Sequence, residues 1–321
     1  MSTFSKVNFK TLNYNSFRPH YPSSFYKILA NYVTKGDESK LPLGKSIDLG
    51  CGTGVATYPL LNISQEVYGL DLSPSMIETA NSLIESRLAE LGISDLNRIK
   101  FKSGAVEDFV NKKQSSKEEG LEEGTIDLIT AAQCIHWFKD YDSFFENAAK
   151  LLRPGGVLAY FFYNDPVIVD YSGSGADKDE VVNKAKKIYF KYVYDDPKYI
   201  GPHWEQPGRN IVKHFLEEVN AKVPKELYTD ITINTFKPSP SKPVADIETD
   251  LDLKKMNLSL KGYVDYLSTY SGFHNYKDAT GDKDDVLELF LTELEQETGW
   301  DRNTTKIDLV WNTGYTFIRR K

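Results

Sequence analysis

The chain has 321 residues, of which 40% are hydrophobic and 26% are charged, and its formal net charge at pH 7 is −7. This composition is typical of a globular protein with a sizeable core, and no run of eighteen apolar residues predicts a membrane span or a secretory signal. The basic residues are scattered rather than clustered, which argues against nucleic acid as a partner. Only two cysteines occur, so we expect no cysteine-rich zinc site and no bound metal. The sequence therefore predicts a cytoplasmic, monomeric protein that binds small molecules.

Segments typical of strands and helices alternate from residue 46 to residue 160. A helix is expected to begin after Ser73, which can cap it, with Pro74 at its first position and its end near residue 91. Pro59 should shorten or kink any helix before the second strand. The predicted strands are 46–50, 66–72, 98–104, 125–133, 156–163, 228–236 and 306–320, and further helices are expected over 140–152, near 258–271 and over 284–298. This order predicts an α/β fold with a doubly wound, mostly parallel seven-stranded sheet and helical insertions after strands five and six.

Three glycines alternate in the stretch IDLGCGTGV, residues 47–55, directly after the first predicted strand. The dinucleotide fingerprint requires a third glycine where this chain has Thr53 or Val55, so we reject a nicotinamide oxidoreductase. The pattern D-x-G-x-G-x-G, which begins at Asp48, resembles motif I of the class I S-adenosylmethionine-dependent methyltransferases. That resemblance implies a Rossmann-like fold with S-adenosylmethionine as the cofactor.

Further segments that resemble this family follow in the expected order. Asp71 ends the second strand, where its carboxylate can accept hydrogen bonds from both hydroxyls of a ribose. Met76 lies either against the adenine or in the core. The segment SGAVEDF resembles one that usually carries an aspartate at the position of Ala105, so Glu107 or the backbone near Val106 would have to supply the adenine contact. The cofactor-binding residues that the resemblance implies are Tyr14, Asp48, Gly50, Gly52, Gly54, Asp71, Leu72, Met76, Val106, Glu107 and Gln133.

The residues after the fourth strand indicate which branch of the family this chain resembles. Enzymes that methylate amino groups of nucleic acid carry N/D-P-P-Y/F there, whereas this chain has QCIHWF, residues 133–138. Together with YNSFRPHYPSSFY at 14–26, this stretch resembles the trans-aconitate methyltransferases, and the fungal members also share YNDP, GPHWEQPGRN, YLSTYSGFHNYKD and KIDLVWNTGY. The resemblance implies a monomethyl ester made on a small polycarboxylic acid, most of all trans-aconitate, and a relative in the same group methylates cantharidin.

Methylation of a carboxylate makes simple demands on an enzyme. A carboxylate with a pKa of about 4 is ionised at neutral pH, so no general base is needed and catalysis depends on orientation. Arg209 is the first candidate to bind a carboxylate of the substrate, with a surface salt bridge as the alternative. His136 either donates a hydrogen bond to the substrate or is structural, and Trp137 is expected to wall the pocket. The other candidate substrate residues are Arg18, Tyr21, Trp204 and His274.

The chain is expected to divide into three parts. An arm and first helix, 1–45, would close over the cofactor, a core, 46–164, would bind it, and a C-terminal part, 165–321, would hold the substrate-pocket insertions and the last two strands. Two other functions remain open. One is methylation of a hydrophobic diacid or a xenobiotic such as cantharidin, and the other is a non-catalytic, cofactor-binding regulatory role, which the missing acid at Ala105 favours.

Overall fold

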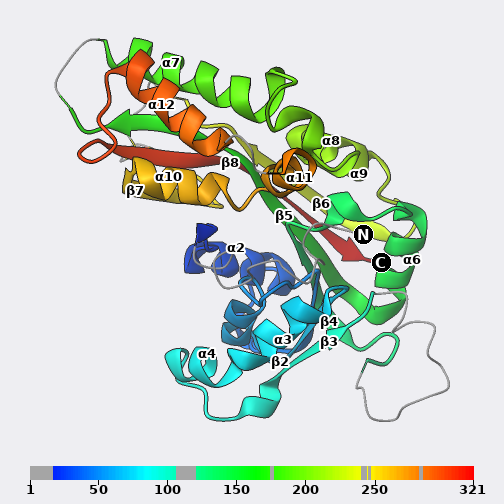
Figure 1. Cartoon of the computed structure of the whole chain (residues 1–321). Helices are drawn as coiled ribbons and strands as arrows, with labels where there is room; N and C mark the ends of the chain where they lie inside the picture. Colours follow the sequence, from blue (N-terminus) through cyan, green and yellow to red (C-terminus); the bar gives the residue numbers. More distant parts are fainter. Residues whose placement is uncertain (1–16, 106–120, 174–176, 240–243, 245–246, 282–284) are drawn as a thin grey trace. The chain divides into compact units, whose positions relative to one another are not determined.

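The computed structural model describes residues 17–105, 121–173, 177–239, 244, 247–281 and 285–321 (Figure 1). Its strands are β1 (Leu43–Leu49), β2 (Ser64–Asp71), β3 (Ile99–Ser103), β4 (Ile126–Ala132), β5 (Leu152–Tyr171), β6 (Tyr228–Phe236), β7 (Lys254–Ser259) and β8 (Lys306–Arg320). Its α-helices are α2 (Ser23–Thr34), α3 (Pro74–Ser82), α4 (Ile84–Glu90), α6 (Tyr141–Leu151), α7 (Lys178–Phe190), α8 (Gly208–Lys213), α9 (Glu217–Ala221), α10 (Leu260–Leu267), α11 (Ser271–Thr280) and α12 (Val286–Thr298). The seven predicted strands are all present, and β7 is an addition to them.

The chain forms two compact units, which are described separately. Unit 1 comprises Met1–Pro19, Asn164–Arg209 and Phe236–Asn312, and unit 2 comprises His20–Tyr163, Asn210–Thr235 and Thr313–Lys321. Helix α2 and the two later segments 210–235 and 313–321 belong to unit 2 together with the first five strands up to Tyr163, so this unit is not continuous in sequence.

A mostly parallel sheet forms the centre of unit 2. Its strand order is β3-β2-β1-β4-β5-β8-β6, and the pairs β1–β2, β1–β4, β2–β3 and β4–β5 are parallel. The order reverses between β1 and β4. In open α/β sheets, ligands bind outside the carboxyl ends of the strands at such a switch point. The residues that follow β1 and β4 are therefore the first place to look for a site.

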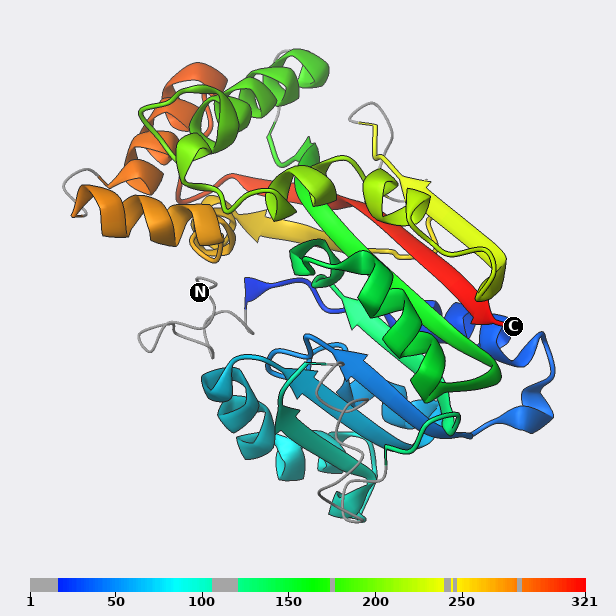
Figure 2. The same ribbon diagram turned by 90° about the vertical axis from the view of Figure 1, so that its right-hand side faces the viewer.

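Neighbouring residues of β5 show which helices cover which face of this sheet. Tyr160 and Phe162 belong to the same hydrophobic cluster as Phe145 of α6. Phe161, between them, packs edge-on against Phe25 of α2 with 4.9 Å between ring centroids. Because side chains alternate along a strand, α6 and α2 cover opposite faces, and α6 lies in front of the strands in Figure 2. This is the doubly wound arrangement that the sequence predicts.

Unit 1 has a buried core of its own. It contains the second part of β5, the first part of β8 and the strand β7, which pairs with β8 in the antiparallel direction. Helix α7 packs beside α12 in this unit (Figure 1). Trp311 of β8 has no exposed surface, and its indole N–H donates to the hydroxyl of Tyr266 at 2.8 Å. The apolar side of α10 is thereby fastened to the strand.

Strand β5 extends beyond the predicted 156–163. It continues through Pro166 to Tyr171, where Val167 and Val169 pack with Val310 in a small hydrophobic cluster of unit 1. β-Branched side chains favour a strand. A proline interrupts this part and removes one backbone donor, so a strand that crosses it is difficult to predict from local pattern.

The helix expected near residues 258–271 is wrong in its bounds. Ser259 accepts a hydrogen bond from the backbone N–H of Gly262 at 3.0 Å, which caps α10 and fixes its start at residue 260. The residues before the cap form β7 by pairing with β8, a partner far along the chain that local periodicity does not reveal. A second helix, α11, begins after Tyr270, so the predicted helix is in fact two.

The helix expected over 73–91 begins as predicted and ends early. Ser73 caps α3 by accepting a hydrogen bond from the N–H of Met76 at 3.4 Å, and Pro74 occupies the first position. The helix then breaks at Leu83, after which α4 follows. The segment around Pro59 forms only the short 3-10 helix η3 (Tyr58–Asn62), as a proline at this position would dictate.

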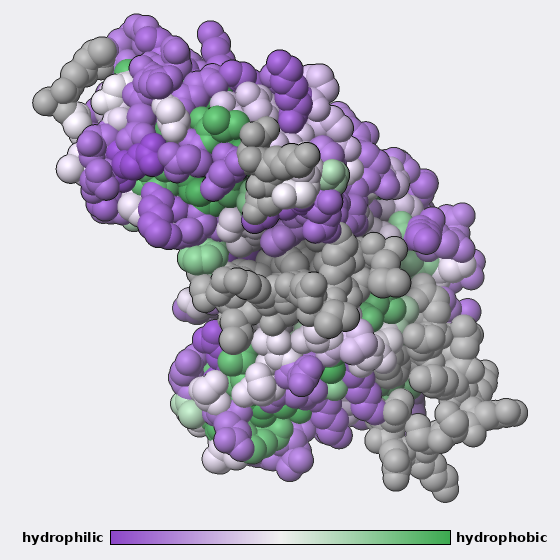
Figure 3. All heavy atoms as spheres, viewed as in Figure 1, coloured by the Kyte–Doolittle hydropathy of each residue, from purple (hydrophilic) through white to green (hydrophobic). Residues whose placement is uncertain are grey.

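None of the described helices is long and apolar enough to cross a membrane. The coloured parts of the face drawn in Figure 3 are mostly hydrophilic and carry several separate hydrophobic areas. Among the large hydrophobic side chains that are exposed, Leu72 shows 73% of its surface. It directly follows Asp71, the predicted ribose ligand.

Phe145 tests the packing of α6 on the sheet of unit 2. Its side chain has no exposed surface and lies in the cluster with Tyr160 and Phe162, so its truncation leaves a cavity. We expect Phe145→Ala to lower the free energy of unfolding by about 3–5 kcal/mol in urea denaturation followed by circular dichroism. The control is Leu289→Ala, at a residue that is 43% exposed, which should cost less than about 1 kcal/mol. Equal losses in the two variants would contradict this packing.

Candidate functional site

The glycine turn after β1 has the geometry of a ligand cradle. Gly50, Gly52 and Gly54 have φ angles of 60°, 54° and 89°, a region that residues with a side chain rarely adopt. A Cβ atom on Gly50 would lie 2.5 Å from the Cβ atom of Cys134, so the turn passes too close to the residues after β4 for any side chain. A Cβ atom on Gly52 would meet no atom within 4 Å. The turn is packed at Gly50 and open at Gly52, where a ligand can approach the backbone.

Asp71, the last residue of β2, lies next to this opening. Its Oδ2 atom accepts a hydrogen bond from the N–H of Gly52 at 2.9 Å, and its Oδ1 atom accepts one from the N–H of Ser73 at 2.8 Å. Burial raises the pKa of Asp71, and the two backbone hydrogen bonds oppose that rise. Each carboxylate oxygen has a second lone pair. The carboxylate is therefore fixed in place and can still accept hydrogen bonds from two hydroxyl groups.

Asp48 is fully buried beneath the turn. The hydroxyl of Thr130 in β4 donates to its Oδ1 atom and the hydroxyl of Thr57, at the end of the turn, donates to its Oδ2 atom, both at 2.6 Å. Burial raises the pKa of Asp48 to about 6, although the two threonine hydrogen bonds lower it. Asp48 thus connects β1, β4 and the turn, and its expected contact with the cofactor stays a prediction.

The other residues predicted to contact the cofactor near Asp71 differ in exposure. Leu72 is 73% exposed, whereas Met76 is 4% exposed, as a core residue of α3 would be. A large exposed apolar side chain beside Asp71 is suited to contact with a flat, partly apolar ligand. The expected contacts of Tyr14, Val106 and Glu107 lie outside the described residues and stay predictions.

Gln133 and Tyr21 both pack against the last residues of β5 in unit 2. The side-chain amide of Gln133 binds the backbone of Tyr163 twice: Nε2 donates to the carbonyl oxygen at 2.6 Å, and Oε1 accepts from the N–H at 3.1 Å. Its φ angle of 58° is unusual for a residue with a side chain. Tyr21 packs edge-on against Phe161 with 4.9 Å between centroids. Gln133 therefore fastens the end of β4 to β5.

His136 and Trp137 lie in the 3-10 helix η5 (Ile135–Trp137). His136 is 6% exposed, and its ring centroid lies 4.8 Å from that of Trp137. The next residue, Phe138, packs against the hydrophobic cluster of unit 2. The pair is thus anchored just beyond the carboxyl end of β4, and its expected role toward a substrate stays a prediction.

Arg209 lies among aromatic rings in unit 1. Its guanidinium carbon is 4.2 Å from the ring centroid of Trp204 and also lies over Tyr194 and Tyr270. Its Nη2 atom donates to Oδ1 of Asp165 at 2.6 Å, and the two side chains are 12% and 9% exposed. Burial lowers the pKa of Arg209, but Asp165 and neighbouring tyrosines raise it more, so the net shift is upward and the charge is retained. The salt bridge that we considered as an alternative is present, but it is buried rather than at the surface.

Asp165 is the acceptor at the centre of this cluster. Its Oδ1 atom also accepts hydrogen bonds from the hydroxyl groups of Tyr189 at 2.5 Å and Tyr194 at 2.6 Å. In contrast, the Nε–H of Arg209 is buried and has no hydrogen-bond partner in the part of the chain that the structure describes. A buried donor without an acceptor costs about 1–3 kcal/mol. The cluster therefore contains one donor on a charged group whose hydrogen bond is not satisfied by the described residues.

Tyr270 brings three of the predicted substrate residues together. Its ring centroid lies 5.6 Å from the guanidinium carbon of Arg18 and 5.2 Å from the ring centroid of Trp204, in addition to its contact with Arg209. Arg18 also donates through Nη2 to the carbonyl oxygen of Thr269 at 2.9 Å. A patch of two cations and several aromatic rings therefore occupies one part of unit 1.

The candidate residues divide between the two units. His274, on α11, has its ring 5.8 Å from that of Phe273. The candidates in unit 1 are Arg18, Trp204, Arg209 and His274, and those in unit 2 are Tyr21, Asp48, Gly50, Gly52, Gly54, Asp71, Leu72, Met76, Gln133, His136 and Trp137. The roles of both sets toward a cofactor or a substrate stay predictions.

Comparisons with known proteins were made for the whole chain. Over 321 residues it is 23% identical to a probable S-adenosylmethionine-dependent methyltransferase, CRG1, of Saccharomyces cerevisiae, and covers 99% of that relative. It is 24% identical to methyltransferase ptaI of Pestalotiopsis fici, with 90% of this chain and 87% of the relative covered. Residues 47–158 match a family model described as a methyltransferase domain. Over these residues the chain is similar to methyltransferase domains, which agrees with the class I S-adenosylmethionine-dependent family that its motifs resemble.

Solved structures agree with the fold of the methyltransferase. A structure from Anaeromyxobacter dehalogenans, provisionally named a type II methyltransferase, covers 95% of this chain and 97% of its own with a TM-score of 0.57 and 19% identity. The Rossmann-like fold predicted from the sequence is confirmed, and S-adenosylmethionine is the cofactor of the domain. The expected contacts of the Gly52 turn and of Asp71 with the amino-acid and ribose parts of that molecule stay predictions.

Asp165 is the functional candidate that sequence reasoning missed. It lies in the YNDP stretch, residues 163–166, which the resemblance to the fungal enzymes includes without giving this acid a role. A signal was present, since Asp165 is an acidic residue two positions after the predicted strand 156–163 and is followed by the apolar residues 166–169. Its partners Tyr189 and Tyr194 could not be recognised, because nothing in the sequence separates them from the other tyrosines of the chain.

Gly52→Ala tests the turn as the cofactor site of the methyltransferase domain. The new methyl group would meet no protein atom but would occupy the opening, and the backbone conformation would be strained by about 1–2 kcal/mol. We expect the affinity for S-adenosylmethionine to fall at least about tenfold in calorimetry. The control is Gly92→Ala, because Gly92 also has a positive φ, 71°, and free space around a Cβ atom. Equal losses of cofactor affinity in both variants would rule out this site.

Asp48→Asn tests the buried carboxylate through its pH dependence. The pKa of about 6 in the folded protein lies above the ordinary 3.8, so the folded state binds the proton more tightly than the unfolded chain. Its contribution to stability is fully present below about pH 4 and is lost as the pH rises through about 6. In urea denaturation, the free energy of unfolding of Asp48→Asn relative to the wild type should therefore rise between about pH 4 and 6, by at most about 3 kcal/mol, and should stay constant above about pH 7.

Asp37→Asn is the control for this pH profile. Asp37 is exposed, and a hydrogen bond from Ser39 lowers its pKa, so its contribution is constant above about pH 4. The stability difference between this variant and the wild type should not change with pH over the same range. If the stability difference between Asp48→Asn and the wild type is also independent of pH, Asp48 has an ordinary pKa.

Proposed function

We propose that the protein transfers the methyl group of S-adenosylmethionine to a carboxylate oxygen of a small polycarboxylic acid, with trans-aconitate as the first candidate. The observation that supports an acid is the Nε–H of Arg209, a buried donor on a charged group without an acceptor in the described residues. A carboxylate oxygen is the strongest partner for such a donor. The resemblance of the HWF and WEQPGR stretches to the trans-aconitate methyltransferases supports the same class of substrate.

The chain's residues suit a reaction that needs no general base. When bound, the cofactor supplies an electrophilic methyl group, which an ionised carboxylate can take up directly to leave S-adenosylhomocysteine and an ester, without a proton transfer. Asp71 would hold the ribose and Arg209 a carboxylate that does not react. His136 would position a substrate rather than remove a proton. Orientation of this kind lowers a barrier by several kcal/mol without any acid or base.

A hydrophobic diacid is the second candidate substrate. The guanidinium of Arg209 is flanked by Trp204 and Tyr194, whose rings are nearly parallel, with 18° between planes and 6.0 Å between centroids. Aromatic planes next to a cation favour an acid with an apolar skeleton over a fully hydrophilic one. The two candidates differ in the rest of the molecule and share the carboxylate.

The proposal is tested with methyl-labelled S-adenosylmethionine and a panel of acids that includes trans-aconitate, citrate and the dicarboxylate formed when the anhydride cantharidin adds water. We expect label in a base-labile ester, with faster transfer to trans-aconitate than to this hydrophobic diacid. Faster transfer to the hydrophobic diacid than to trans-aconitate would support the hydrophobic diacid as the substrate. Binding of the cofactor without transfer to any acid would contradict both and support the non-catalytic, regulatory alternative.

Arg209→Lys tests the residue that supports the choice of an acid. Lysine keeps the positive charge beside Asp165 but lacks the Nε donor, and a hydrogen bond to a charged group is worth about 1.5–3 kcal/mol. We expect KM for the acid to rise about tenfold to a hundredfold, with an unchanged affinity for S-adenosylmethionine. The control is Arg153→Lys, which alters an arginine that pairs with Asp127 at 2.5 Å. Equal changes in KM in both variants would exclude Arg209 from the substrate site.

A further inference from the structure

A cavity of about 260 Å³ lies in unit 1 and has no place in the proposed reaction. Residues of β5, α7 and α10, with the segment after β6, enclose it. Most of the wall is apolar. The apolar lining residues include Val167, Ile168, Val182, Ala185, Phe190 and Pro238.

The polar groups at the bottom of the cavity are already engaged. Asp165 and Tyr189, both buried, line it, and the tyrosine hydroxyl donates to the carboxylate at 2.5 Å. Asn312 also lines the cavity, and its amide donates to the backbone carbonyl of Asp165 at 2.8 Å. The carboxylate is further neutralised by Arg209. The Asp165 carboxylate therefore needs no cationic ligand, and the interior of the cavity is suited to contact with an apolar chain.

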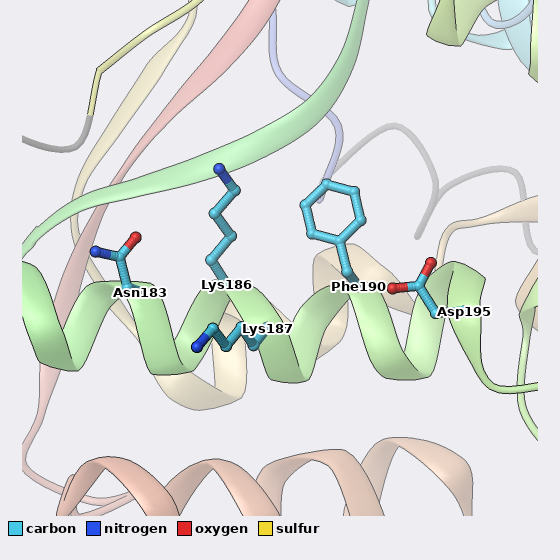
Figure 4. A pocket seen from close by; sticks show the side chains of 5 residues that line it. All are labelled: Asn183, Lys186, Lys187, Phe190 and Asp195. Atoms are coloured by element: carbon cyan, nitrogen blue, oxygen red, sulfur yellow. The ribbon is translucent and has the colours of Figure 1, made fainter.

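Positive charge stands at the outer edge of the cavity. Lys186 and Lys237 line it and are both exposed. Lys186 and Phe190 also line a second hollow of about 480 Å³ on the outside of α7, where Lys187 adds a further cation and Asp195 the opposing charge. In Figure 4, Lys186 and Phe190 point from α7 to the same side, as their spacing of one helical turn requires. The inner cavity and the outer hollow thus share two side chains.

An apolar interior next to a cationic edge selects one class of ligand. We propose that unit 1 holds a second binding site, beyond the methyl-transfer function, for a small amphipathic anion such as a medium-chain aliphatic carboxylate. The apolar chain occupies the cavity and the carboxylate lies between Lys186 and Lys237. A polycarboxylic acid does not fit this description, because burial of its additional charges among apolar walls is unfavourable. Pockets for drug-sized molecules measure about 300–1,000 Å³, so this cavity suits a smaller ligand.

Octanoate is the probe for this site, with calorimetry on the full-length protein as the measurement. We expect saturable binding of octanoate and at least about fivefold weaker binding of octanol, which lacks the charge. The double variant Lys186→Glu/Lys237→Glu should weaken octanoate binding at least about tenfold, and both positions are exposed, so the fold should be kept. The matched control is Lys184→Glu, an exposed lysine on the same helix that pairs with Glu180, which should leave the affinity unchanged.

The apolar part of the site is tested separately with Ala185→Trp. Ala185 is 1% exposed, and a larger side chain should fill the cavity and abolish octanoate binding, provided that circular dichroism confirms the fold. If the Ala185→Trp variant does not fold, the lysine variants alone test the proposed site. Equal weakening by Lys184→Glu and by the double variant would overturn the proposal. Displacement of octanoate by trans-aconitate would also overturn it, because the cavity would then belong to the acceptor site.

Discussion

The ligand-binding edge of unit 2 depends on one buried carboxylate. Asp48 has no exposed surface, and a buried charge is tolerated only when its oxygens are hydrogen-bonded. Both oxygens are satisfied by hydroxyls, from Thr130 of β4 and Thr57 at the end of the glycine turn. These requirements place β1, β4 and the turn in one fixed arrangement. The opening at Gly52 therefore lies on a turn that these hydrogen bonds hold against β1 and β4.

The parts of the fold that could be predicted are those with a local cause. Ser73 and Pro74 specify the start of α3, and alternating apolar segments specify the parallel strands. The parts that could not be predicted depend on partners far along the chain. Strand β7 exists because it pairs with β8, and β5 continues through Pro166 because Val167 and Val169 find a hydrophobic cluster. Hydrophobic periodicity indicates the secondary structure of a segment but not the segments that it contacts.

The same distinction applies to the site. The glycine turn after β1 and the place of Asp71 at the end of β2 could be predicted from local spacing, whereas their contacts with the cofactor stay predictions. The arrangement around Arg209 could be predicted only in part. The arginine itself lies in a distinctive loop sequence, but Asp165, Tyr189 and Tyr194 reach it from other elements. Nothing in their local sequence distinguishes them from structural residues, because their role arises from tertiary contact.

Arg209 is held in place before any ligand arrives. Its guanidinium is stacked on Trp204 and bonded to Asp165, whose own position is set by two tyrosine hydroxyls. Ordering a long, flexible side chain during binding costs about 0.5–1.5 kcal/mol in rotamer entropy. In this protein that entropy is lost on folding instead. The small acid that we propose as the substrate can make only a few contacts, so it would retain more of their free energy as affinity, and this gain would depend on the stability of unit 1.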